Sequence, residues 1–221
     1  MLSELPYAIV TAGVALAGLW ISNLLFDLKI PHYISRKIGH SAGGTAFLMC
    51  GLLFSSATWP IILAAAFTAM LAVARLTEPS AFRGVGGSGR NKTTIAEVWF
   101  PLVAIPVFAI AWQWLRMPWV AVTCLLYMAW GDCITGLVRF KVYGRPVKGM
   151  WGSFAMLLAC LALSAAFLHP FWIGAVASVV AVVTEWAAGD VGLLRWADDN
   201  WAIPVTSLAA ILLLGRATGS L

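Results

Sequence analysis

Charge is the scarcest property of this 221-residue chain: only 10% of its residues are charged, while 62% are hydrophobic. A soluble domain carries far more charge, so this composition excludes an ordinary soluble protein. Most of the uncharged runs approach the ~20 apolar residues that a membrane-spanning helix needs, although the second and eighth are short. The sequence therefore predicts an all-α, polytopic membrane bundle that forms a single domain over residues 1–221. The eight predicted helices lie at about 5–26, 40–55, 57–74, 98–115, 117–138, 150–168, 171–188 and 201–215.

The chain also lacks the signatures of several other classes. Its cysteines stand singly, without the spacing of a zinc site or a disulfide framework, so we expect them to fill the core. The net charge is +5, but no long basic arm accompanies it, and we expect no nucleic-acid partner. Glu4 stands where a cleaved signal has positive charge, so the first apolar run is expected to be retained. The cysteines are Cys50, Cys124, Cys133 and Cys160.

The few charges gather on one side of the predicted membrane. If all eight runs cross, twelve of the fourteen lysines and arginines share a side, and only Arg116 and Arg216 lie opposite. An excess of Lys and Arg marks cytoplasmic loops, so both termini are expected outside the cytoplasm. All carboxylates except Glu4 join the basic side, and topology gives no reason for that. Any chemistry is therefore expected at the cytoplasmic face.

A carboxylate ends the fifth apolar run. Asp132 follows Gly131 and precedes Gly136, where the apolar pattern still predicts helix. A charge at membrane depth costs about 2.5–3.5 kcal/mol, so such a residue usually faces a polar interior and a partner of opposite charge. We therefore expect Asp132 to pair with a cation.

Basic and small residues follow this carboxylate. Arg139, Arg145 and Lys148 precede Gly152 and Ser153, which open the sixth apolar run. Cations and backbone amides at a helix N-terminus form a natural phosphate site, and glycines let a phosphate approach closely. The alternative is that the basic residues only set the topology and the glycines only allow close packing. That alternative does not account for Asp132.

A second acidic block lies near the C-terminus. Glu185 is in the seventh apolar run, and Asp198, Asp199 and Asn200 precede the eighth. Oxygen ligands of this kind suit Mg²⁺. One of the two aspartates could instead cap the last helix. Capping does not explain Glu185 in an otherwise apolar helix, so a functional role is favoured for it.

Taken in order, these motifs resemble those of the CTP-dependent polyprenol kinases, the family of dolichol kinase and phytol kinase. An Arg-Lys-x-x-His motif of that family is matched by Arg36, Lys37 and His40, and an acidic-aromatic-proline segment by residues 97–101. The chain departs from the family at Gly149, where Ser or Thr is common, and at Arg139, where glycine is common. The remaining matches are Gly131-Asp132, Lys148, Gly152-Ser153, Glu185, Asp199-Asn200 and Pro204.

The resemblance implies transfer of the γ-phosphoryl group of CTP to the terminal hydroxyl of an isoprenoid alcohol. Mg²⁺ would be held by Asp132 and Asp199 with Asn200 in support, and Glu185 would be a further metal ligand or the base. His40 would orient a carboxylate or a phosphate. The nucleotide phosphates would contact Lys148, Arg139, Arg145, Gly152, Ser153, Lys37 and Arg36.

Other interpretations stay open at this stage. A CTP:phosphatidate-type cytidylyltransferase would use the same nucleotide and metal but would make a CDP-lipid. A small transporter would spread its carboxylates through the membrane instead of collecting them at one face. A scaffold would give no reason for paired acidic and phosphate motifs. We expect an integral protein of a prokaryotic plasma membrane, with nucleotide, isoprenoid alcohol and membrane lipids as partners; the sequence indicates no oligomeric state.

Two prolines interrupt the fourth apolar run. Pro101 and Pro106 are expected to bend this helix and to open space in the bundle, because proline removes a helical hydrogen bond.

Overall fold

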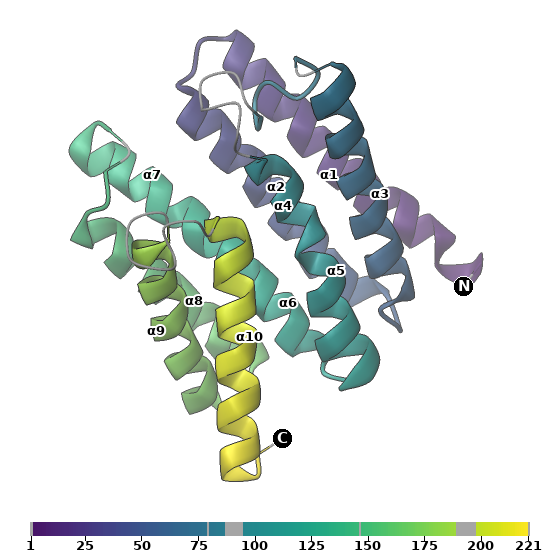
Figure 1. The fold of residues 1–221 in the computed structure, drawn as a ribbon, viewed down its shortest axis with the longest axis vertical. Coiled ribbons are helices and arrows are strands. Elements are labelled where there is room, and N and C mark those ends of the chain that lie inside the picture. The colour runs from purple at the N-terminus through teal and green to yellow at the C-terminus, as the bar shows by residue number, and fades with distance from the viewer. Residues whose placement is uncertain (1, 79, 87–94, 146, 189–197, 221) are drawn as a thin grey trace.

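The structure is a computed structural model that describes residues 2–78, 80–86, 95–145, 147–188 and 198–220. These residues form helices and no strands (Figure 1). After a short turn, η1 (Leu2–Glu4), the eight predicted runs all correspond to helical segments, so the all-α prediction is confirmed. Five of them are α1 (Leu5–Asp27), α2 (His32–Leu53), α3 (Thr58–Thr77), α8 (Met150–Phe167) and α9 (Phe171–Ala187), and the last is α10 (Asp199–Thr218).

The fourth and fifth segments are broken into pieces. The fourth comprises α4 (Ala96–Leu102), α5 (Ala104–Val107) and the π-helix η2 (Phe108–Trp114). Pro101 lies inside α4, and the α-helix is interrupted at Val103, two residues after it. The expected bend stays a prediction. The fifth comprises α6 (Pro118–Leu126), the π-helix η3 (Tyr127–Gly131) and α7 (Asp132–Tyr143).

Six of the segments in the described part of the chain are long and apolar enough to cross a membrane. The segment containing α10 is one of them, because the helix starts before its apolar run and reaches 20 residues. The two that fall outside this group are α2, whose first turns carry charge, and α9, which has only 17 residues. The membrane assignment is therefore supported by composition and length.

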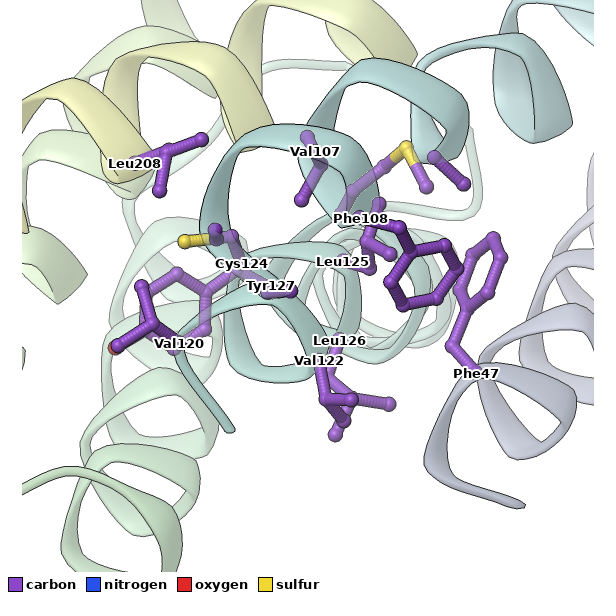
Figure 2. Packing of buried hydrophobic residues seen from close by; sticks show 14 of the residues in the cluster. Phe47, Val107, Phe108, Val120, Val122, Cys124, Leu125, Leu126, Tyr127 and Leu208 are labelled. Carbon is purple, nitrogen blue, oxygen red and sulfur yellow. The ribbon is translucent and has the colours of Figure 1, made fainter. Parts of the chain in front are cut away.

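The segment α6 with η3 forms the centre of the bundle. Every side chain from Val120 to Ala129 is buried, as expected for a helix that is apolar all round. Figure 2 shows Phe47, Phe108 and Leu125 packed in this region. The outer helices instead expose large apolar side chains, as lipid-facing helices do. Asp132 thus begins α7 at the end of this buried segment.

The charged ends of the helices lie together. In Figure 1 the α1–α2 turn, the C-terminal end of α3, the α7–α8 turn and the N-terminal end of α10 lie toward one end of the bundle. The N-terminus and the C-terminus lie toward the other. Glu4 accepts hydrogen bonds from the backbone and hydroxyl of Ser55, each at 2.8 Å, which ties the N-terminus to the α2–α3 turn. That this charged end is cytoplasmic stays a prediction.

Candidate active site at the charged end of the bundle

Asp132 pairs with a lysine from a distant part of the chain. Lys37 Nζ, on α2, donates to Asp132 Oδ2 at 2.5 Å, and each side chain is only 4% exposed. Lys37 Nζ also lies 5.6 Å from the ring centre of Tyr33. A Cβ on Gly136 would come within 2.6 Å of Lys37 Cε, so glycine is needed for Lys37 to approach α7. The carboxylate thus has the cationic partner that the sequence predicts, held by α2 and α7.

A second buried pair joins α7 to α9. Arg139 donates through both terminal nitrogens to Glu185, at 2.7 Å from Nη1 to Oε1 and 3.0 Å from Nη2 to Oε2. Arg139 Nη2 also donates to Ser153 Oγ on α8, at 3.3 Å. A Cβ on Gly152 would lie 2.5 Å from Arg139 Cγ and Nε, so this glycine makes room for the arginine. A bidentate ion pair of this kind fixes the relative orientation of the guanidinium and carboxylate planes.

The two ion pairs belong to one electrostatic cluster. Glu185 lies close enough to Asp132 and Asp199 for their charges to act on it. The charges of both the Lys37–Asp132 pair and the Arg139–Glu185 pair act on the Tyr33 side chain. Buried charges are strongly coupled because little water screens them. Side chains from α2, α7, α8, α9 and α10 therefore meet in this region.

The first turn of α10 presents oxygen atoms. Asp198 is its N-cap and accepts from the backbone N–H of Asn200 at 3.0 Å, so the capping alternative is confirmed for this aspartate. Burial, and after it the charge of Asp199, raise the pKa of Asp198 to about 6. Asn200 is fully buried; its Nδ2 donates to Ala96 O at 3.1 Å, while its Oδ1 has no partner among the residues that the structure describes.

Arg36 and His40 connect this turn to α2. Arg36 is 8% exposed, and its charge acts on both Asp198 and His40. Within the described ranges its Nε has no hydrogen-bond partner. His40 is 4% exposed and packs on Phe100 with ring centres 4.5 Å apart. Its Nδ1 also has no partner in the described part of the chain. Buried polar atoms are nearly always hydrogen-bonded, so these atoms need a partner that the described side chains do not supply.

An apolar pocket opens next to His40. It lies between α1, α2, α3 and the α4–η2 segment. Besides His40, its polar side chains are Thr11 and Glu97. Glu97 is 8% exposed and accepts from Arg75 Nη1 at 2.9 Å. Glu97 was not among the predicted site residues, although it starts the acidic-aromatic-proline segment.

Two predicted phosphate ligands lie outside the buried cluster. Arg145 and Lys148 are exposed on the α7–α8 turn. Lys148 Nζ donates to the carbonyls of Trp186 and Ala188, at 2.8 and 2.6 Å, at the C-terminal end of α9. Lysine is favourable there because the last carbonyls of a helix carry partial negative charge. Lys148 is thereby tied to the end of the helix that carries Glu185.

Binding of Mg²⁺ stays a prediction. Among the described residues no group of three or more His, Cys, Asp and Glu side chains is arranged to hold a metal ion. Mg²⁺ usually needs only one or two carboxylates, with substrate phosphates and water completing its shell. The carboxylate of Asp199 and the unpartnered Oδ1 of Asn200 are suitable donors, so the residues fit Mg²⁺.

Comparison with known proteins identifies two relatives. The chain is 27% identical over 226 aligned positions to "Probable phytol kinase 2, chloroplastic" of Oryza sativa subsp. japonica, covering 92% of this chain and 74% of the relative. It is 29% identical over 196 positions to "Phytol kinase" of Synechocystis sp. (strain ATCC 27184 / PCC 6803 / Kazusa), covering 84% and 82%. No family model and no solved structure matches the chain. The resemblance predicted from the sequence is confirmed by these two relatives.

Proposed function

We propose that this chain, a protein of a polyprenol/phytol kinase-like family, transfers the γ-phosphoryl group of CTP to the terminal hydroxyl of an isoprenoid alcohol. Its relatives are named as phytol kinases, and its membrane helices support an integral membrane protein. The use of CTP and Mg²⁺, the cytoplasmic orientation and the prokaryotic plasma membrane belong to the proposal.

One observation carries the proposal: a single stretch of α2 borders both an apolar pocket and a charged cluster. His40 lines the pocket, while Lys37 pairs with Asp132 and the charge of Arg36 acts on Asp198. An isoprenoid alcohol needs an apolar site for its chain and a charged site at its hydroxyl. The boundary at His40 offers both within one helical turn.

The cations suit the phosphates of a nucleotide. Lys37 and Arg139 are buried, and each is positioned by a carboxylate, Asp132 or Glu185. Phosphoryl transfer depends mainly on positioning and on stabilising negative charge, and cations fixed before the reaction do both without reorganisation. The exposed Lys148 and Arg145 supply positive charge at the approach to this cluster.

Asp199 and Asn200, with Asp132, would hold Mg²⁺. Bound there, the ion would supply charge neutralisation between the phosphates. The chain's own contribution is to hold oxygen donors on the first turn of α10, where the charge of Arg36 on α2 acts on Asp198. Asp198 orders this turn as its cap, which keeps Asp199 and Asn200 in place.

Glu185 is the group we assign to the proton of the alcohol. The hydroxyl oxygen forms a bond to the γ-phosphorus, the bond to the CDP oxygen breaks, and the hydroxyl proton passes to the Glu185 carboxylate. Arg139 fixes the orientation of this carboxylate through its two hydrogen bonds. A correctly placed base typically contributes about 10²–10⁴ in rate.

The test uses purified protein in detergent with γ-labelled CTP, Mg²⁺ and a panel of isoprenoid alcohols. We expect labelled lipid phosphate from the wild type and none from Asp132→Asn. Asp27→Asn is the matched control, because Asp27 is 45% exposed and pairs with Arg83 at the same end of the bundle. Full turnover in Asp132→Asn, or no labelled lipid from any alcohol with the wild type, would contradict the proposal.

A further inference from the structure

We infer that the pocket between α1, α2, α3 and the α4–η2 segment binds the isoprenoid chain, with its hydroxyl end at His40 and Glu97. The size of the side chain at position 64 sets the longest chain that is accepted. The identity of the ligand rests on the proposed function, whereas the orientation and the length limit follow from the pocket itself.

The pocket follows the axis of α2. Its lining on this helix runs from residue 39 to residue 50 on one face, and eleven residues of helix rise about 16 Å. Small side chains line much of that face: Gly39, Gly43 and Ala46. The pocket, called the channel below, therefore extends along α2 from the charged end of the bundle toward its apolar interior.

The two ends of the pocket differ in polarity. Glu97 and His40 stand at the end nearest the charged cluster, and the unpartnered His40 Nδ1 is buried there. A hydroxyl group both donates and accepts, so it can satisfy Nδ1 in either ring tautomer. Pro60, Cys50 and Thr11 line the other end, where a hydroxyl would meet apolar side chains and the one Thr11 hydroxyl, which also has no partner among the described residues, but no carboxylate or imidazole. This difference orients the alcohol with its hydroxyl outward, toward the cations.

Position 64 lies well inside the channel. Ala64, on α3, is only 6% exposed. Leu71 marks the polar end of the channel on this helix, because it also lines a small neighbouring cavity together with Glu97. Ala64 is seven residues, or about 10 Å, from Leu71. A phenylalanine at position 64 would block the channel about 10 Å from its polar end. The part between position 64 and the polar end would stay open. Ala66, two residues on, is exposed and does not line the pocket, so Ala66→Phe adds the same bulk to the outer face of the same helix.

The first experiment compares kcat/KM for geraniol, farnesol and geranylgeraniol, which have 10, 15 and 20 carbons, in Ala64→Phe, Ala66→Phe and the wild type. We expect Ala64→Phe to reduce the ratio of the 20-carbon to the 10-carbon value at least tenfold, and Ala66→Phe to leave it unchanged. Ala64→Val should give an intermediate ratio if the larger residue disturbs folding. An unchanged ratio in an active Ala64→Phe protein overturns the length assignment.

The second experiment reads binding without turnover. A 20-carbon isoprenol carrying a diazirine at its apolar tip should label the peptides around Cys50 and Pro60, and one carrying it beside the hydroxyl should label those around His40 and Glu97. Excess geranylgeraniol should prevent labelling, and phospholipid should not. Reversed labelling would overturn the proposed orientation of the alcohol. Equal competition by phospholipid would mean that the pocket binds lipids in general, which would overturn its assignment to the isoprenoid chain. Correct labelling in a protein that phosphorylates no alcohol would refute the proposed function alone.

Discussion

The Lys37–Asp132 pair allows stability and catalysis to be separated. Its side chains are each 4% exposed and their charged atoms lie 2.5 Å apart. Asp132→Asn removes the negative charge and leaves a buried ammonium without its partner. Breaking a buried pair in this way costs about 3–5 kcal/mol, so we expect a loss of that size in the free energy of unfolding. Asp27→Asn breaks the exposed Asp27–Arg83 pair and should lower the free energy of unfolding by at most ~1 kcal/mol.

Removing both charges should give a different result. In Lys37→Met combined with Asp132→Asn no unpaired charge remains, and replacing a buried pair by uncharged groups is often close to neutral. Most of the stability should therefore return. Phosphorylation should not return, because we assign Lys37 to the phosphates and Asp132 to the metal.

The assay measures unfolding of both single variants, the double variant and the wild type in the same detergent, together with the rate of lipid phosphorylation. The four free energies of unfolding form a double-mutant cycle, which gives the interaction free energy between Lys37 and Asp132. A double variant as unstable as Asp132→Asn would mean that the loss of stability does not come from the unpaired charge of Lys37, which would contradict the reasoning. A double variant that regains turnover would mean that the pair is structural only.

Two further predictions concern Arg139 and its neighbours. Glu185→Gln should lower kcat by about 10²–10⁴ without changing the Mg²⁺ concentration needed for half-maximal rate, if Glu185 is the base; a raised requirement for Mg²⁺ would identify it as a metal ligand instead. Gly152→Ala should displace Arg139 and reduce kcat/KM for the nucleotide, because the new Cβ would lie 2.5 Å from Arg139 atoms. Gly13→Ala, which has open space around it, is the control and should behave as wild type.

The helices were predictable because the membrane imposes a simple rule on the sequence. Each of the eight apolar runs became a helical segment, since a lipid-embedded backbone must satisfy its own hydrogen bonds. The π-helix that ends at Gly131 was not predicted. Such bulges are frequent at functional sites, and this one comes directly before Asp132, but the residues Tyr127–Gly131 carry no local signal for it.

The site was predictable in its carboxylates but not in all of its partners. A charge in an apolar helix must be compensated, so Asp132 indicated a buried cation, and Glu185 indicated a functional role. The partner of Glu185 was one of the basic residues near Asp132, whereas that of Asp132 is Lys37, 95 residues away. Such a pairing depends on how α2 packs against α7. The pocket was hidden for the same reason, because a cavity exists only once four segments are packed together.

The most direct test of the account follows the phosphorus atoms of the nucleotide. Wild-type protein is incubated with geranylgeraniol, Mg²⁺ and CTP labelled in either the α or the γ position, and lipid, CDP and pyrophosphate are quantified. The account predicts that γ-label enters the lipid with one CDP released for each lipid phosphate formed. Entry of α-label into the lipid with release of pyrophosphate would contradict it and identify a cytidylyltransferase.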